Sequence, residues 1–136
     1  MSMFDALRIS ASGMTAERLR MDVIAGNLAN ANTTRGADGQ PYQRRDVILQ
    51  ETQADSFAAK LAGVRVVGVV DDASPARRVY DPGHPDADAQ GYVSMPNVNS
   101  VTEMVDLITA SRGYEANVTT MNSAKQMFTR TLDILR

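Results

Sequence analysis

Apolar side chains recur at steps of three and four residues near both ends of the chain. This spacing places side chains on one narrow face of an α-helix and is typical of coiled-coil packing. We refer to the two sets together as the terminal stripes. Their larger members are Phe4, Leu7, Met14, Met21 and Leu28 in the N-terminal segment, and Met104, Leu107, Tyr114, Val118, Met121, Phe128, Leu132 and Leu135 in the C-terminal segment. The pattern predicts one long helix at each end of the chain.

Local signals give bounds for the two helices. Ser2 is a predicted N-cap for the first helix, which should end near Asn30, where short polar residues follow. The run Ser100-Val101-Thr102-Glu103 matches a capping box, in which Ser100 caps one amide of the second helix and Glu103 reaches back to another. Gly13 and Gly26 interrupt the first helix, either as tolerated flexible points or as places where a neighbouring helix approaches closely.

The middle of the chain has a different pattern. A possible strand lies within Tyr42 to Gln50, the β-branched run from Val64 to Val70 is the strongest strand signal, and Arg77 to Tyr80 is a third candidate. The sequence therefore predicts a mainly α fold, in which two long terminal helices form an antiparallel coiled-coil-like pair with a small β-rich or irregular insertion between them. The predicted divisions are residues 1–34, 35–99 and 100–136.

The two helices can be aligned by matching small residues with aromatic ones. Phe4 opposite Leu135 places Ala11 beside Phe128 and Ala25 beside Tyr114, so that large and small side chains interdigitate. This register is a hypothesis about the helix pair.

Composition and charge exclude several function classes. The net charge of −2 argues against a nucleic-acid binder, and the pairs Arg44-Arg45 and Arg77-Arg78 are too small for such a surface, so we expect them to be solvated. The absence of cysteine excludes disulfides and thiol chemistry. The single histidine, His84, lies in a Pro/Gly-rich loop with no cysteine or second histidine to share a metal, so we expect no catalytic, cofactor-binding or metal site.

Targeting signals are also missing from the sequence. No apolar run approaches the roughly 20 residues that span a bilayer. The first 15 residues include Asp5 and Arg8 and lack the apolar core of a secretory signal peptide. If the protein leaves the cytosol, we expect a route that does not use a cleaved signal.

Two polar motifs carry a family resemblance. The segments Gly91 to Leu107 and Ala110 to Val118, together with Ser12-Gly13-Met14 and Asn27 to Thr33, resemble the bacterial flagellar basal-body rod protein family. The short middle and the Pro-Asn-Val-Asn form are most similar to its proximal members. The motif residues are Asn27, Asn30, Asn32, Pro96, Asn97, Asn99, Glu103, Arg112, Glu115 and Asn117.

The resemblance implies a structural subunit whose terminal stripes form the assembly seam of a torque-transmitting drive shaft with a central export channel. The implied partners are other copies, other rod proteins, the motor ring, rod-base adaptor proteins and, during secretion, the type III export apparatus. It implies a periplasmic position in the basal body, with no nucleic acid or small-molecule substrate. Other readings are a different rod member, a soluble coiled-coil adaptor or export chaperone, and an enzyme acting on the cell wall. The last would need converging acid and base side chains, which the middle segment does not offer.

Overall fold

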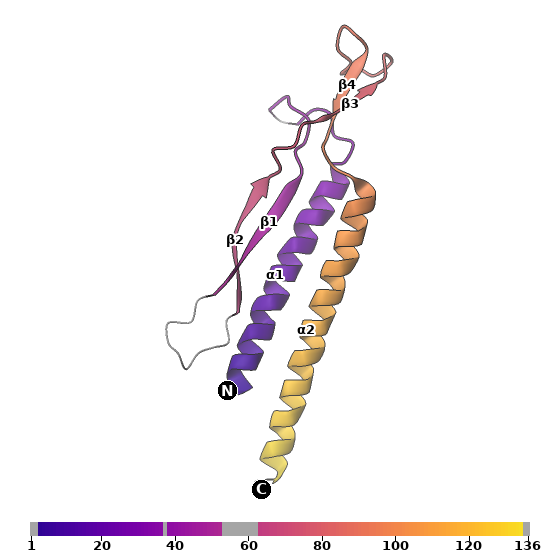
Figure 1. The fold of residues 1–136 in the computed structure, drawn as a ribbon. Helices are drawn as coiled ribbons and strands as arrows, with labels where there is room; N and C mark the ends of the chain where they lie inside the picture. Colours follow the sequence, from indigo (N-terminus) through magenta and orange to yellow (C-terminus); the bar gives the residue numbers. More distant parts are fainter. Residues whose placement is uncertain (1–2, 37, 53–62, 135–136) are drawn as a thin grey trace.

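Two antiparallel helices form the long body of the molecule, and two small β-hairpins are attached to it (Figure 1). The computed structural model describes residues 3–36, 38–52 and 63–134. The elements in chain order are α1 (Met3–Ala29), β1 (Arg45–Glu51), β2 (Val64–Asp71), β3 (Arg77–Tyr80), β4 (Tyr92–Met95) and α2 (Ser100–Ile134). Both terminal helices and the three strands expected from the pattern are confirmed.

The helices α1 and α2 approach each other closely because glycines lie at their contact. A Cβ atom added at Gly13 would lie 3.0 Å from the Asn117 side chain of α2, and one added at Gly113 would lie 3.2 Å from Oε1 of Glu17. By contrast, a Cβ at Gly26 would meet nothing within 4 Å. Of the two readings of the α1 glycines, close approach therefore applies to Gly13 and tolerated flexibility to Gly26.

The register of the helix pair differs from the predicted one. The rings of Phe4 and Phe128 meet edge to face at 6.2 Å between centroids, whereas the predicted alignment put Ala11 beside Phe128. The two helices are therefore displaced by about two turns from the predicted pairing, which was wrong. Glycines and a buried carboxylate set the register, and the spacing of apolar residues carries no information about them. The predicted partner of Phe4, Leu135, lies outside the described residues.

The start of α2 also differs from its prediction. Oδ1 of Asn99 accepts hydrogen bonds from the backbone N–H groups of Val101, at 3.0 Å, and Thr102, at 3.3 Å. Asn99 is therefore the N-cap, and Ser100 is already inside the helix. The Glu103 side chain turns inward to meet an arginine, so the predicted capping box does not form. The Ser2 cap predicted for α1 lies outside the described residues.

The middle segment contains two separate antiparallel hairpins. In the first, β1 pairs with β2 with an irregularity between Ile48 and Leu49, and the hairpin lies along α1 (Figure 1). In the second, β3 pairs with β4 at one end of the molecule. The pattern did not predict β4, because a four-residue strand with one buried side chain, Val93, has too little alternation to stand out.

The buried apolar side chains are few and small. In the described part of the chain they are Ala16, Ile24, Ala31, Val93, Pro96, Val98, Ala110 and Ala124. Neither helix of the described chain has an apolar stretch long enough to cross a membrane. Many larger apolar side chains remain on the surface, and their positions bear on function.

Candidate functional site

A cluster of polar side chains joins the two helices to the start of the first hairpin. Glu103 on α2 and Asn27 on α1 are both 0% exposed. Nδ2 of Asn27 donates to Oε2 of Glu103 at 3.0 Å, and Nε of Arg44 donates to Oε1 of Glu103 at 2.6 Å. We call the five residues Asn27, Tyr42, Arg44, Asn97 and Glu103 the polar clasp.

Asn27 uses both ends of its amide in the polar clasp. Its Nδ2 also donates to the carbonyl of Arg45 at 2.8 Å, while its Oδ1 accepts from the Arg45 backbone N–H at 2.9 Å and from the Tyr42 hydroxyl at 3.0 Å. Its amide therefore joins α1 to α2 and to the first residue of β1. A buried amide without these partners would cost about 1–3 kcal/mol.

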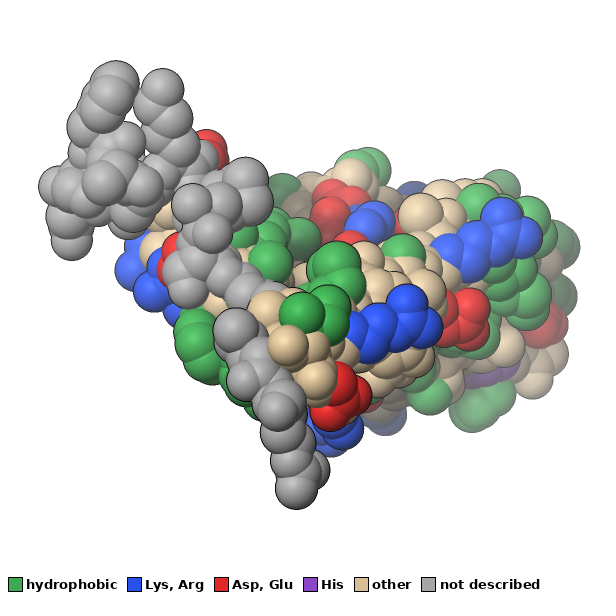
Figure 2. All heavy atoms as spheres, turned by 90° about the horizontal axis from the view of Figure 1, so that it is seen from below, with side chains coloured by type: hydrophobic (Ala, Val, Ile, Leu, Met, Phe, Trp, Pro, Cys, Tyr) green, Lys and Arg blue, Asp and Glu red, His purple; other side chains and the backbone are tan. Residues whose placement is uncertain are grey.

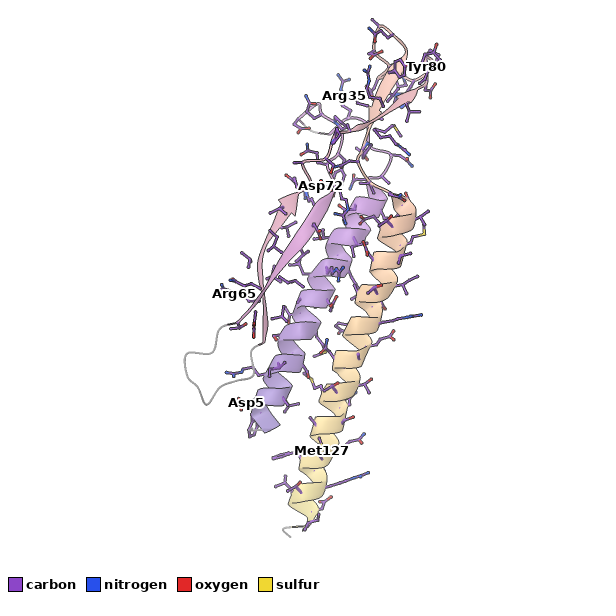
Figure 3. The ribbon with its side chains drawn as sticks, in the orientation of Figure 1. Asp5, Arg35, Arg65, Asp72, Tyr80 and Met127 are labelled. Atoms are coloured by element: carbon purple, nitrogen blue, oxygen red, sulfur yellow. The ribbon has the colours of Figure 1, made fainter. Side chains whose placement is uncertain are left out.

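Asn97 extends the polar clasp to the connection between the two hairpins. Its Oδ1 accepts from the backbone N–H of Arg44 at 2.7 Å, and its Nδ2 donates to the carbonyls of Asp72 and Ser74, each at 3.1 Å. Figure 3 places Asp72 at the end of the helix pair where α2 begins. The polar clasp thus ties four segments of the chain together at one end of the helices.

Arg44 lies at the centre of the polar clasp and is much closer to one carboxylate than to three others. The guanidinium of Arg44 lies 2.6 Å from Glu103 and 3.6 to 3.9 Å from Asp46, Asp72 and Asp106. The hydrogen bond to Glu103 raises the pKa of Arg44, against the opposing effect of burial. Burial raises the pKa of the Tyr42 hydroxyl, which helps it to remain a donor to Asn27. Breaking a buried ion pair of this kind by removing one partner costs about 3–5 kcal/mol.

The structure corrects the expectation for Arg44. The pair Arg44-Arg45 was expected to be solvated, but the Arg44 side chain is only 21% exposed and lies in the polar clasp. Arg45 is more open and pairs with Asp71 at 3.3 Å. Sequence spacing could not reveal the partner of Arg44, because Glu103 lies 59 residues further along the chain.

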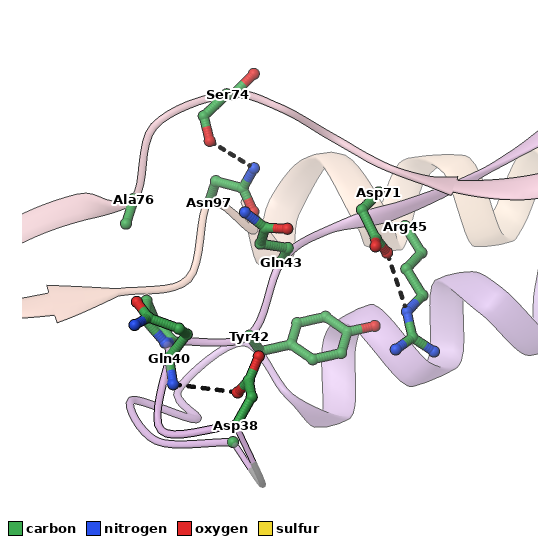
Figure 4. A pocket seen from close by; sticks show the side chains of 11 residues that line it. Asp38, Gln40, Tyr42, Gln43, Arg45, Asp71, Ser74, Ala76 and Asn97 are labelled. Atoms are coloured by element: carbon green, nitrogen blue, oxygen red, sulfur yellow. Dashed lines mark hydrogen bonds and ion pairs between the residues drawn. The ribbon is translucent and has the colours of Figure 1, made fainter.

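A polar groove of about 600 Å³ lies beside the polar clasp (Figure 4). The Arg45–Asp71 ion pair and the Tyr42 ring line it on one side, and Asn97 lines it on the other. Its walls carry neither histidine nor cysteine, and the Ser74 hydroxyl donates to Oδ1 of Asp72 at 2.6 Å within an exposed turn. Across residues 3–36, 38–52 and 63–134, no three His, Asp or Glu side chains are grouped so that they could hold a metal ion.

The other motif residues have separate positions. Asn30 donates from Nδ2 to the Gly26 carbonyl at 2.9 Å and closes the end of α1, and Asn32 is exposed in the turn that follows. Pro96 is buried just before α2. Asn117 packs against Gly13, as described above, whereas Arg112 and Glu115 are exposed on α2. The motifs thus combine residues of the polar clasp, the helix contact and the surface.

The terminal stripes are only partly covered within one chain. Phe4, Met104, Phe128 and Leu132 are exposed, with Phe4 at 69%. The remaining described members are half-buried: Leu7, Met14, Met21, Leu28, Leu107, Tyr114, Val118 and Met121. Leu135 lies outside the described residues. Around Gly13 and Gly113 the helix contact is made by small and polar residues, whereas Phe4 meets Phe128 nearer the ends of the chain.

Comparisons with known proteins give matches in both helical segments. A family model for the flagella basal body rod protein matches residues 7–37, and one for the flagellar basal body rod FlgEFG protein C-terminal matches residues 89–134. The first match includes Asn27, and the second includes Asn97, Glu103 and the whole of α2. The matched segments therefore contain most of the polar clasp and the helix contact.

Several curated relatives match over nearly their whole length. The flagellar basal-body rod protein FlgC of Borreliella burgdorferi is 43% identical, and the alignment covers 100% of this chain and 99% of the relative. FlgC of Escherichia coli O6:H1 is 44% identical over 98% of both chains, and FlgC of Bacillus subtilis is 45% identical over 98% of this chain and 99% of the relative. The chain belongs to the FlgC family of flagellar basal-body rod proteins.

Proposed function

We propose that the chain is a structural subunit of the proximal part of the bacterial flagellar basal-body rod. It polymerises through its two terminal helices into a torque-transmitting shaft that surrounds a central export channel. The observation that carries this proposal is the identity of 43–45% to FlgC proteins over almost the full chain. The exposed stripe residues Phe4, Met104, Phe128 and Leu132 support it, because apolar surface of this kind marks protein contacts.

In this role the terminal stripes are the assembly seam, and residues 1–34 and 100–136 form one axial helical unit around which residues 35–99 are arranged. In the shaft, neighbouring subunits complete the coiled-coil-like packing of the half-buried stripe residues. Many such contacts of modest strength act together, and a close-packed bundle of helices resists twisting.

The partners in this proposal are other copies of the chain, other rod proteins, the motor ring and rod-base adaptor proteins. The chain passes through the type III export apparatus without a cleaved signal and reaches the periplasmic part of the basal body. No enzymatic step, cofactor or nucleic acid is part of the role.

The polar clasp has a mechanical task in this role. It fixes the first hairpin and the link between the hairpins to both helices at one place, through Glu103 and Asn97. Force applied to the middle segment is then transferred to the helices through buried, directional bonds. A hydrogen-bonded ion pair is suited to this because its geometry is fixed.

The test uses a strain of the source bacterium that lacks the gene and is complemented with variants. Leu132→Asp and Tyr114→Asp each place a charge on the proposed seam, where burial by a neighbour would be costly. We expect the variant chains to be secreted while rod assembly and motility are lost. Thr119→Asp, at an exposed polar site on the same helix, is the matched control and should support motility. Normal assembly of both stripe variants would exclude the seam.

A further inference from the structure

The helix α2 extends past the start of α1. It is 35 residues long against 27 for α1, and Phe4, near the start of α1, meets Phe128. Figure 3 shows Met127 on the part of α2 that continues beyond Asp5. Leu132 and Ile134, at 50% and 85% exposed, follow in the last turns. Figure 2 views the molecule from this end and shows hydrophobic side chains there beside charged ones. We call Phe128, Leu132 and Ile134 the overhang.

Two residues of the overhang, Phe128 and Leu132, continue the contact face of α2, whereas Ile134 lies on another side of the last turn. Ala124 is buried, Phe128 is four residues further and touches Phe4, and Leu132 is four residues beyond that. Residues at this spacing lie above one another on a helix. The described part of α1 begins at Met3, close to the Phe4–Phe128 contact, and α2 continues past this contact to Leu132 and Ile134.

A second apolar surface lies at the other end of α2. Val101, Met104, Val105 and Ile108 have the spacing of one helix face and are 71%, 50%, 58% and 54% exposed. This face is opposite Ala110, which is buried. We call these four residues the head patch. Further along the same face, exposed polar residues replace the apolar ones: Arg112, Glu115, Thr119, Asn122 and Gln126.

The overhang and the head patch cannot meet within one chain. Met104 and Leu132 lie on one continuous helix, separated by about 42 Å at 1.5 Å per residue. Each surface covers about two helical turns, so the two are similar in length. The overhang and the head patch lie at opposite ends of α2. When one subunit is displaced along the helix axis relative to another, the overhang of the first therefore comes to lie against the head patch of the second.

We propose that the overhang of one subunit packs on the head patch of the axially adjoining rod-family subunit. The inference rests on the proposed function and adds the surfaces that make the axial contact. The occupant is the first two turns of the α2 helix of the adjoining subunit, because the rod-family model that matches residues 89–134 includes the whole of α2. Contact between two different surfaces is heterologous, and where its rotation does not close a ring it propagates along an axis.

The test places a photocrosslinking residue on the overhang in assembled basal bodies. The strain that lacks the gene is complemented with Leu132→benzoylphenylalanine or, in case that variant fails to assemble, Ile134→benzoylphenylalanine. Basal bodies are purified and irradiated, and crosslinked peptides are identified by mass spectrometry. We expect the band of the uncrosslinked chain to weaken and a crosslinked product to appear. In this product the overhang is joined to the first two turns of an α2-type helix. Ile108→benzoylphenylalanine should give the reciprocal product, joined to the last turns of such a helix.

Asn122→benzoylphenylalanine, on the polar part of the outer face, is the matched control and should give neither product. Crosslinks from the overhang to a β1–β2 hairpin, to a ring protein or to lipid would overturn the axial contact, as would the absence of crosslinks from a chain present in basal bodies. In each of these cases the proposed function still stands. Motile cells whose basal bodies lack the chain would overturn the proposed function as well.

Discussion

Glu103 is a charged residue in a place where apolar residues are the rule. It is fully buried, and its two carboxylate oxygens are satisfied by Arg44 and Asn27. A charge in such a site is tolerated only when its partners are in place. The three residues come from α2, α1 and the segment before β1, so the correct docking of all three segments is required to satisfy one carboxylate.

Removal of this carboxylate should be among the most destabilising changes in the chain. We expect Glu103→Ala to lower the free energy of unfolding by about 3–5 kcal/mol, because Arg44 and Asn27 lose a buried partner. Urea denaturation of the purified chain measures this. Glu115→Ala, at an exposed position of the same helix, should change stability by less than about 0.5 kcal/mol. Similar losses for the two variants would mean that the polar clasp contributes little.

At the scale of the elements, the close contact of α1 and α2 decides the register. Gly13 and Gly113 allow side chains of the opposite helix to approach the backbone. Interfaces built on small residues permit close approach and leave large side chains to the flanks. The stripe residues Leu7, Met14 and Met21 are accordingly half-buried.

A pair of alanine substitutions in α1 tests this contact. Gly26→Ala should stabilise the chain by up to about 1 kcal/mol, because alanine favours the helix and its Cβ meets nothing within 4 Å. Gly13→Ala should give less stabilisation or a net loss, because its Cβ would lie 3.0 Å from Asn117, which is held by a hydrogen bond to the Gly113 carbonyl. Thermal unfolding of the two variants gives the comparison. An equal gain from both would show that the contact is not tight.

Most of the helices and strands could be predicted from the sequence. The repeat of three and four residues predicted both helices, and the β-branched run predicted β2, because these signals are local. The register, the Asn99 cap and the partner of Arg44 were not predicted. Each depends on a residue distant in sequence or on competition between local bonds: Glu103 pairs with an arginine 59 positions away, which removes it from the capping box that its position suggested.

At the scale of the whole molecule, the buried polar clasp lies at one end of the helix pair. The polar clasp holds both helices where the chain enters and leaves the middle segment, while the opposite end has the Phe4–Phe128 contact and the overhang. Stability is therefore expected to be uneven along the helix pair, since local opening follows the density of buried contacts.

Amide hydrogen exchange of the purified chain should reveal this gradient. We expect the slowest exchange in α2 near Glu103 and Ala110, and progressively faster exchange toward Phe128 and Leu132. Mass spectrometry of peptides from α2 measures it. Uniform rates along α2, or faster exchange near Glu103 than near Leu132, would contradict the gradient.

Within one subunit, α2 is held at one end by the polar clasp and projects past the Phe4–Phe128 contact at the other, as a cantilever does. In the proposed shaft, the tip of each subunit remains compliant until the next arrival presses against it. The shaft then becomes stiff one subunit behind its growing end. The newest subunit can still adjust its position, and each earlier subunit has been made rigid by the one added after it.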